Sequence, residues 1–252
     1  MTNHNVRPFW ARVLPGLSIF SFLILSACGN PNSQTEAQTA SNGDFVSIFD
    51  GETLDGWEGS PDHWRVENGE LVGYTSTEKP LASNTFLIWR EGEPSDFELK
   101  LEFKISENGN SGVQYRSEEL QDPKLALKGY QADIDGKNTY TGQNYEERGR
   151  GFLAKRGEIA VLKSGQEPEI TGSLGDSEEL KAKINFEDWN TMRIVARGNH
   201  MKHYVNGELM SEVTDEDTEL RKMKGKLGLQ VHTGPPMEVR YRNIEYKDLS
   251  GQ

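Results

Sequence analysis

The side chains best suited to chemistry in this chain gather between Gly129 and Arg150, in the stretch GYQADIDGKNTYTGQNYEERGR. The stretch begins with alternating apolar and polar residues, as a half-buried strand does, and continues as a charged loop. Its polar members include Gln131, Asp133, Asp135, Tyr145, Glu146, Glu147, Arg148 and Arg150. Carboxyl groups can transfer protons, and amide or guanidinium groups can bind the hydroxyl groups of a ligand. The pattern predicts an inner strand and a rim loop, with the two arginines as structural partners of the acidic loop residues.

Alternation along four expected strands predicts that further polar side chains share one non-core face. The outward residues are Gln114 and Arg116 in 111–117, Gln131, Asp133 and Asp135 in 129–135, Gln230 and His232 in 226–232, and Arg240 and Arg242 in 237–244. Gln, Asp, Arg and His side chains on a concave sheet would suit a polyhydroxylated ligand. The alternative is an ordinary surface, with Asp133 simply paired to an arginine.

The elements that must position these residues are strands. The segment Phe97–Ile105 alternates apolar and charged residues without interruption, which is the period-2 pattern of a half-buried strand. Asn-Gly pairs at Asn68-Gly69 and Asn206-Gly207 lie between apolar runs and predict hairpin turns. Only Asp176–Ile184 resembles a helix. A dozen or so strands with such turns predict an all-β fold, a two-sheet antiparallel jelly-roll sandwich.

The N-terminus has the pattern of a targeting segment. Two arginines precede a continuous apolar run, Leu17–Leu25, which suits a secretory signal better than a permanent membrane span. The run ends in LSAC, which resembles a bacterial lipobox, so residues 1–27 are expected to be a lipoprotein signal peptide and Cys28 the lipidated residue. The alternative is an ordinary signal peptide that happens to be followed by a cysteine.

Residues 28–44 contain almost no large apolar side chains and are expected to form a flexible tether, which leaves residues 45–250 as one domain. The net charge of −12 argues against a nucleic-acid partner and against adhesion to anionic lipid. The membrane link would be the acyl chains alone. Because Gly29 rather than Asp follows Cys28, we expect the outer membrane, facing the periplasm or the exterior. As the only cysteine, Cys28 excludes an internal disulfide.

Several motifs, taken in order, resemble one family. They are FVSIFDGETLDGW (45–57), FELKLEFKISENGNSGVQYRS (97–117), GYQADID (129–135), WNTMRIVARGNHMKHYVNG (189–207) and GKLGLQVHTGPPMEVRYRNIEYKDL (225–249). The chain resembles the 3-keto-disaccharide hydrolase domain family over nearly all of residues 45–249. The resemblance implies a concanavalin A-like jelly-roll sandwich. Others in the family carry Glu where this chain has Gln131, which removes one carboxylate that could act as a base.

The resemblance also implies cleavage of glycosides that carry a ketone at sugar carbon 3, usually after a separate oxidoreductase, a sugar 3-dehydrogenase, has acted. A C3 ketone acidifies the hydrogen on C2. A base can therefore remove that proton, the group on C1 leaves by elimination, and water adds to the enone. Such a site needs a base, an electrophile at the carbonyl oxygen and an acid for the leaving oxygen.

We expect His232 or Asp133 to be the base and Glu146 or Tyr145 the acid, with Arg116 stabilising the enolate. The expected substrate-binding residues are Gln114, Gln131, Tyr145, Gln230 and Trp89, the last as a stacking platform, although core packing is the more usual role of a tryptophan at such a position. A divalent metal held by Asp133, Asp135 and His232 could replace Arg116 as the electrophile.

Three other functions remain open. A non-catalytic carbohydrate-binding lipoprotein, lectin-like, would need the same hydroxyl-binding groups without a base. A structural lipoprotein would display the domain to partners. A retaining endo-glucanase is disfavoured because the chain lacks paired carboxylates at E-x-D-x-x-E spacing.

Overall fold

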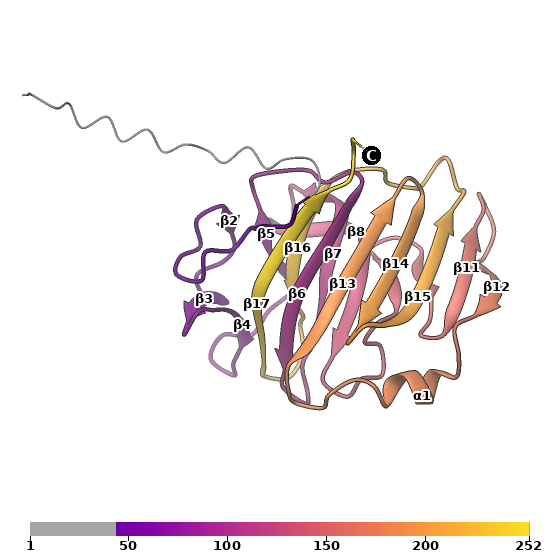
Figure 1. Cartoon of the computed structure of the whole chain (residues 1–252). Coiled ribbons are helices and arrows are strands. Elements are labelled where there is room, and N and C mark those ends of the chain that lie inside the picture. Colours follow the sequence, from indigo (N-terminus) through magenta and orange to yellow (C-terminus); the bar gives the residue numbers. More distant parts are fainter. Residues whose placement is uncertain (1–43, 252) are drawn as a thin grey trace, which may run out of the picture. The chain divides into compact units, whose positions relative to one another are not determined.

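The computed structural model of this chain describes residues 44–251, which lie within one compact unit. The expected signal peptide, Cys28 and nearly all of the expected tether lie outside these residues. Two sheets form the fold (Figure 1). The ten-stranded sheet contains β1 Val46–Ser47, β3 Trp64–Glu67, β4 Glu70–Thr75, β6 Phe97–Ile105, β11 Glu158–Leu162, β12 Glu169–Ser173, β13 Asn190–Arg197, β14 His200–Val205, β15 Glu208–Asp215 and β17 Met237–Asp248.

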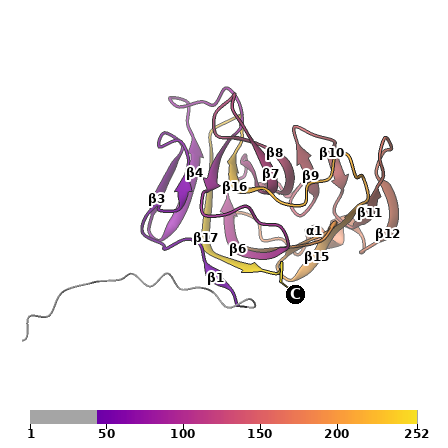
Figure 2. The same cartoon turned by 90° about the horizontal axis from the view of Figure 1, so that it is seen from above.

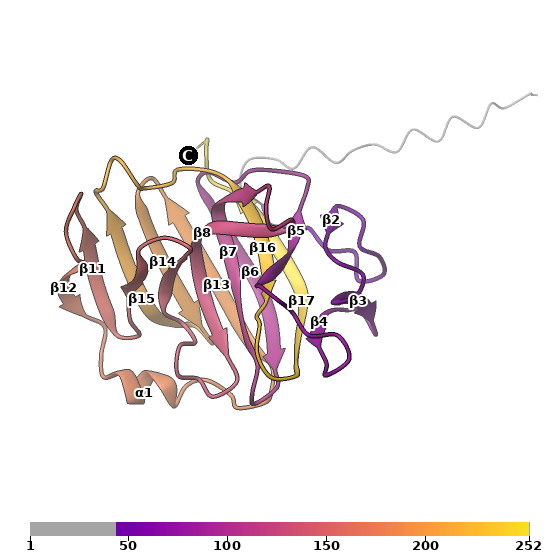
Figure 3. The same cartoon turned by 180° about the vertical axis from the view of Figure 1, so that it is seen from behind.

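The seven-stranded sheet has the order β10-β9-β8-β7-β16-β5-β2, and Figure 3 views the molecule from its side. Its strands are β2 Trp57–Glu58, β5 Thr85–Trp89, β7 Asn110–Leu120, β8 Ala126–Asp135, β9 Asn144–Glu147, β10 Gly151–Ala154 and β16 Lys226–Val231. The pairing is antiparallel throughout this sheet. The ten-stranded sheet has one parallel pair, β11 with β15, and the prediction of a two-sheet sandwich is confirmed.

Local sequence explains these elements. The alternation in β6 is reproduced, with its apolar side chains buried and its charged ones half-buried. The turn residues Asn68 and Asn206, each before a glycine, have φ of 55° and 50°, the left-handed conformation that a two-residue hairpin needs. The expected helical piece is α1 Ser177–Lys181, where the Asp176 carboxylate accepts hydrogen bonds from two backbone N–H groups. Between residues 44 and 251 no helix has the length and apolar character to cross a membrane.

The core lies between the two sheets, which Figure 2 shows from above as two layers. Phe97 of β6 packs edge-on against Tyr115 of the smaller sheet, Tyr115 stacks on Tyr130, and all three are almost fully buried. Burying such a side chain contributes about 1.5–3 kcal/mol. The inward-facing residues thus fix which side chains of β7, β8 and β16 point away from the core.

The hairpin β7–β8 bends before it reaches its tip. Arg116 has a φ of 46°, and the register of the two strands shifts between Tyr115 and Glu118. Beyond the bend, Leu127 packs with Phe86 and Ile88 in a small apolar cluster separate from the main core. The hairpin tip therefore covers part of the outer face of the seven-stranded sheet and leaves the region near β9 and β10 open.

Candidate functional site

A cavity of about 240 Å³ lies on the open part of the seven-stranded sheet. Five neighbouring strands or the segments that follow them line it, from β10 to β16. The lining residues are Asn110, Gln131, Asp133, Tyr140, Tyr145, Glu147, Phe152 and His232. We call this cavity the β8 pocket. The structure thus brings together four of the residues expected at the site, namely Gln131, Asp133, Tyr145 and His232.

Asp133 is the most perturbed carboxyl group of the pocket. Burial raises its pKa well above the ordinary value, the negative charges of Asp135 and Glu147 add to the rise, and a hydrogen bond from Gln131 opposes it. That bond runs from Gln131 Nε2 to Asp133 Oδ1 over 2.8 Å. None of the ion pairs found in residues 44–251 involves Asp133. A carboxyl group in this state keeps its proton to a higher pH than an ordinary aspartic acid does.

A chain of side-chain hydrogen bonds leads to Asp133. Ser117 Oγ donates to Gln114 Oε1 over 2.5 Å, and Gln114 Nε2 donates to Gln131 Oε1 over 3.3 Å. Gly112, paired with Asp133 on the neighbouring strand, makes room for this arrangement. A Cβ atom at Gly112 would lie 2.5 Å from Gln131 side-chain carbons, too close for contact. The glycine is therefore needed for Gln131 to lie across β7 and orient Asp133.

His232 lies at the opposite side of the lining, directly after β16. Its Nδ1 lies 2.5 Å from the carbonyl oxygen of Thr233, which places the proton on Nδ1 and a lone pair on Nε2. No described residue hydrogen-bonds to Nε2. Asn84 supports this corner, because its Oδ1 accepts from Thr233 N over 3.0 Å and its Nδ2 donates to Glu147 Oε1 over 3.1 Å. His232 thus presents a proton acceptor within the pocket.

Aromatic residues form the remaining wall. Tyr145 pairs with Gln131 across β8–β9 and with Phe152 across β9–β10. Burial raises the pKa of the Tyr145 hydroxyl, and the negative charges of Glu147 and Asp133 raise it further. Tyr145 therefore stays protonated and can donate a hydrogen bond. Phe152 and Tyr140 continue the wall towards solvent.

Asp135 does not point its carboxylate at a ligand. The carboxylate accepts from the backbone N–H groups of Thr139, Tyr140 and Thr141 over 2.7–3.0 Å and so fixes the loop after β8. No group of three or more His, Cys, Asp or Glu side chains in residues 44–251 is placed to hold a metal ion. The hypothesis of a metal site made by Asp133, Asp135 and His232 is therefore not supported.

Arg116 is not a pocket residue, contrary to the prediction. Its side chain is fully buried, and the guanidinium donates to the carbonyl oxygens of Ser95 and Gly198 over 2.8 and 2.7 Å and to Asp96 Oδ1 over 3.0 Å. The alternation failed because the bulge in β7 places Arg116 in a left-handed conformation, which breaks the period of two. Arg116 fixes loops and does not face a substrate.

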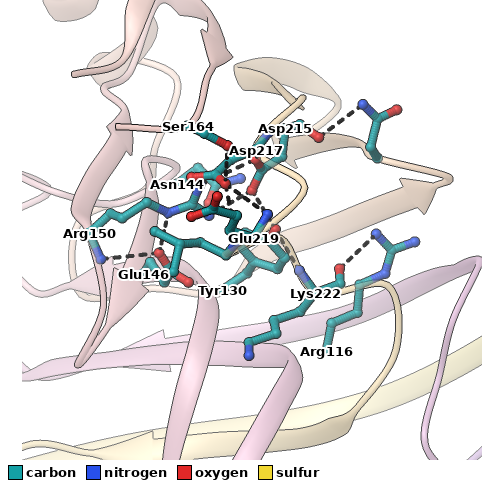
Figure 4. Close-up of polar contacts among 12 residues, drawn as sticks. Arg116, Tyr130, Asn144, Glu146, Arg150, Ser164, Asp215, Asp217, Glu219 and Lys222 are labelled. Carbon is teal, nitrogen blue, oxygen red and sulfur yellow. Dashed lines mark hydrogen bonds and ion pairs between the residues drawn. The ribbon is translucent and has the colours of Figure 1, made fainter. Parts of the chain in front are cut away.

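Glu146 was also wrongly placed, since the next residue, Glu147, lines the pocket instead. Glu146 points to the other side of β9, where its Oε2 accepts from Arg150 Nε over 2.6 Å (Figure 4). Arg150 also contacts Asp215 over 2.6 Å and Asp217 over 3.7 Å. We call Glu146, Arg150, Asp215 and Asp217 the Arg150 cluster. The prediction that Arg150 pairs with acidic residues is confirmed, and Arg148 lies 3.8 Å from Glu147.

Other expected residues lie beside or away from the pocket. Gln114 and Gln230 are fully buried and do not line it, and neither amide atom of Gln230 has a hydrogen-bond partner in the described part of the chain. Trp89 belongs to the core and packs against Tyr246, so it is no platform for this pocket. Arg240 and Arg242 belong to β17 in the other sheet, where they pair with glutamates.

Sequence reasoning did not assign Glu147, Asn110, Tyr140, Phe152 or Asn84. Glu147 could have been found, because residues two positions apart in a strand face the same side. A strand that directs Tyr145 into the pocket therefore directs Glu147 there too. The positions of Tyr140 and Phe152 depend on a loop and a hairpin that alternation does not describe. A larger cavity of about 320 Å³ includes Arg193 and Tyr204 on the ten-stranded sheet, but Arg193 already pairs with Glu98 and stacks on Tyr204.

Comparisons with known proteins agree with this fold and place the chain in a family. A 3-keto-disaccharide hydrolase from Bacteroides thetaiotaomicron is 34% identical over 83 residues, which are 30% of this chain and 28% of that protein. The chain thus matches less than a third of this relative's length.

Two solved structures share the fold at low identity. A protein of Parabacteroides distasonis, provisionally assigned as a glycosyl hydrolase, has a TM-score of 0.54 at 20% identity and covers 82% of this chain and 94% of its own. The carbohydrate-binding module CBM66 of Bacillus subtilis has a TM-score of 0.52 at 17% identity, covering 77% and 96%. The sequence model of one family, the 3-keto-alpha-glucoside-1,2-lyase-like domains, matches residues 44–247. The chain therefore belongs to this family.

Proposed function

We propose that the β8 pocket cleaves glycosides that carry a ketone at sugar carbon 3, by removal of the C2 proton, elimination of the C1 substituent and addition of water. Family membership and the 3-keto-disaccharide hydrolase relative support a glycoside-cleaving activity. The observation that carries the proposal is the pairing of an imidazole with a free Nε2 and a buried carboxyl group of raised pKa in one cavity.

In this proposal His232 is the base. Its Nε2 takes the C2 proton, and the electron pair moves to the C3 oxygen to form an enolate. The protonated Tyr145 hydroxyl stabilises that oxygen by donating a hydrogen bond, a role that the sequence had suggested for Arg116. The geometry of His232 supports the choice, because its Nδ1 is held by a backbone carbonyl and only Nε2 is free to accept a proton.

Asp133 is the acid in this proposal. When the enolate collapses, the C1–O bond breaks and the leaving oxygen takes the proton of Asp133. Asp133 then takes a proton from the water whose hydroxide adds to C1 of the enone, and protonated His232 returns its proton to C2, so both groups are restored and the net reaction is hydrolysis. The raised pKa of Asp133 supports this role, since the group must carry its proton at the start of the cycle.

A second candidate function is carbohydrate binding without catalysis. It is favoured by the exposed aromatic rings of Tyr140 and Phe152, which suit a sugar surface without requiring any proton transfer. This function needs neither the free Nε2 of His232 nor the protonated Asp133, so it explains fewer features of the pocket.

The test uses the purified full chain with a 3-keto-glucoside that releases a chromogenic aglycone, and with the unoxidised parent glucoside. We expect release from the keto substrate alone. His232→Gln should lower kcat by about 10²–10⁴-fold, the usual contribution of a general base. The matched control is His200→Gln, a partly exposed histidine that pairs with Glu212 on the other sheet. No release from either substrate, with sugar binding retained, would favour the carbohydrate-binding function.

The proposal also includes the cellular setting suggested by the sequence. The C3 ketone must come from a separate oxidoreductase, and we propose that Cys28 anchors the domain to the outer membrane through acyl chains. Cys28→Ser should prevent incorporation of labelled palmitate and move the protein from the membrane fraction to the soluble fraction. Unchanged labelling of that variant would contradict the anchor.

A further inference from the structure

The outer rim of the β8 pocket is built from two exposed aromatic rings. Tyr140 and Phe152 are 41% and 39% exposed, and their ring centroids lie 5.7 Å apart at an interplanar angle of 24°. Phe152 also meets the edge of Tyr145, with centroids 5.0 Å apart. The three rings therefore form a continuous wall from the proposed reaction centre to solvent.

The wall is held in place before any ligand arrives. Asp135 Oδ1 accepts from Tyr140 N over 2.7 Å, and Arg156 Nη1 donates to the carbonyl oxygens of Asn138 and Thr141 over 3.0 Å each. These contacts join the loop that carries Tyr140 to the rest of the domain. A wall fixed in this way loses little conformational entropy when a flat ligand face settles on it.

The charge of the pocket limits what can bind there. Asp133 and Glu147 line it, and no Lys or Arg is among its described lining residues. Arg148 lies 3.8 Å from Glu147 but is not itself a lining residue. With Asp133 protonated in the proposed cycle, an acidic substituent on the substrate would meet the Glu147 carboxylate and find no Lys or Arg among the described lining residues to pair with, which disfavours its binding.

We propose that Tyr140 and Phe152 seat the ring attached to the leaving oxygen, and that this ring is uncharged, either a second sugar or an aryl group. This inference rests on the proposed function and adds the substrate class. The negative faces of the aromatic rings attract the C–H groups of a sugar face or the edge of an aryl ring. The pocket then accepts neutral disaccharides and aryl glycosides and discriminates against acidic ones.

The experiment compares kcat/KM of the full chain on 3-keto-glucosides with methyl, glucosyl, 4-carbamoylphenyl and 4-carboxyphenyl aglycones. Phe152→Ala should lower kcat/KM about tenfold for the glucosyl and carbamoylphenyl substrates and less than about twofold for the methyl substrate. Phe186→Ala, which removes an exposed ring that does not line the pocket, is the control. If Phe152→Ala lowers kcat/KM equally for all four substrates, or for none of them, the proposal that Phe152 seats the leaving ring is overturned.

The charge arm uses the last two aglycones, which differ mainly in charge. The kcat/KM of the wild type should be about tenfold lower for the carboxyphenyl substrate than for the carbamoylphenyl one. Glu147→Gln should reduce this difference in kcat/KM. Equal use of both by wild type would overturn the charge selection. Absence of any cleavage would instead count against the proposed function. The aromatic seat would then be tested by calorimetry, as the affinity for the unoxidised disaccharide. The proposal is wrong if Phe152→Ala binds this disaccharide as tightly as wild type does.

Discussion

The β8 pocket and the Arg150 cluster both hold carboxyl groups that solvent hardly reaches, but they balance the charges differently. In the cluster, Glu146 and Asp215 share one guanidinium at 2.6 Å each. Tyr130 donates to Asp215 over 2.6 Å, and Ser164 to Asp217 over 2.7 Å (Figure 4). In the pocket, Asp133 has one amide donor. Matched buried charges hold the fold together, whereas an unmatched one is left with a perturbed pKa and can react.

The largest expected effect comes from breaking the matched region. Arg150→Met should lower the free energy of unfolding by about 3–5 kcal/mol, because it leaves buried carboxylates without their cation. Arg240→Met is the control: its side chain has the same 18% exposure and also contacts three carboxylates, but Glu67 and Glu238 are far more exposed than Asp215. The control should lose about 1 kcal/mol or less. If urea unfolding gives similar losses of unfolding free energy for Arg150→Met and Arg240→Met, then the burial of the carboxylates does not distinguish the two clusters.

The next effect concerns acid stability and comes from a third buried site, His203. This imidazole lies between the sheets, 2.8 Å from the Tyr115 hydroxyl, and burial lowers its pKa to about 4. The unfolded chain takes up the proton near pH 6.5 and the folded chain near pH 4. The free energy of unfolding linked to neutral His203 is therefore fully present above pH 6.5. It decreases as the pH falls towards 4, by about 3 kcal/mol at most.

His203→Gln should flatten this slope, which urea unfolding at pH 7.5 and 4.5 would measure. His200→Gln, a partly exposed site, is the control and should keep the wild-type slope. Comparing slopes removes any constant loss caused by repacking. The idea is wrong if the two variants and wild type all lose stability in parallel on acidification.

Asp133 should act in the opposite direction. Its pKa is raised in the folded chain, so the folded state binds the proton more tightly, and stability falls as the pH rises above about 3.8. Asp133→Asn should abolish cleavage of a keto substrate and yet increase stability at pH 7 by on the order of 1 kcal/mol. Asp96→Asn, which weakens the partner of the buried Arg116, should instead destabilise. A destabilised Asp133→Asn would mean that the pocket carboxylate is as well matched as those of the Arg150 cluster.

The contrast between the two regions also explains what the sequence could reveal. Alternation found Gln131, Asp133 and His232, because β8 and β16 are regular where these residues lie. It could not place Arg116, because a β-bulge reverses which residues face the core and the residue pattern gives no sign of the bulge. The family motifs fixed the fold class, and the choice between Glu146 and Glu147 depended on the face of a four-residue strand.

Tyr140 and Phe152 were beyond such reasoning. Tyr140 is placed by three backbone hydrogen bonds to Asp135 in its loop, and Phe152 by a short hairpin with a register shift. Periodicity treats loops as gaps and assumes regular strands. Tertiary geometry of this kind also directs the Asp135 carboxylate to the backbone of its own loop and away from the lining of the β8 pocket.

The smallest expected effect tests whether the pocket residues are held as a unit. Asn84 joins Glu147 to the turn after His232 through two hydrogen bonds. Asn84→Ala should cost about 1 kcal/mol of stability and lower kcat on a keto substrate about fivefold, because both groups gain freedom. Asn84→Asp separates the two contacts, since it keeps an acceptor for Thr233 N but cannot donate to Glu147. Wild-type kcat in Asn84→Asp would assign the effect to the turn that carries His232. A loss equal to that of Asn84→Ala would assign it to Glu147, and no loss in either variant would show that the free Nε2 is positioned without Asn84.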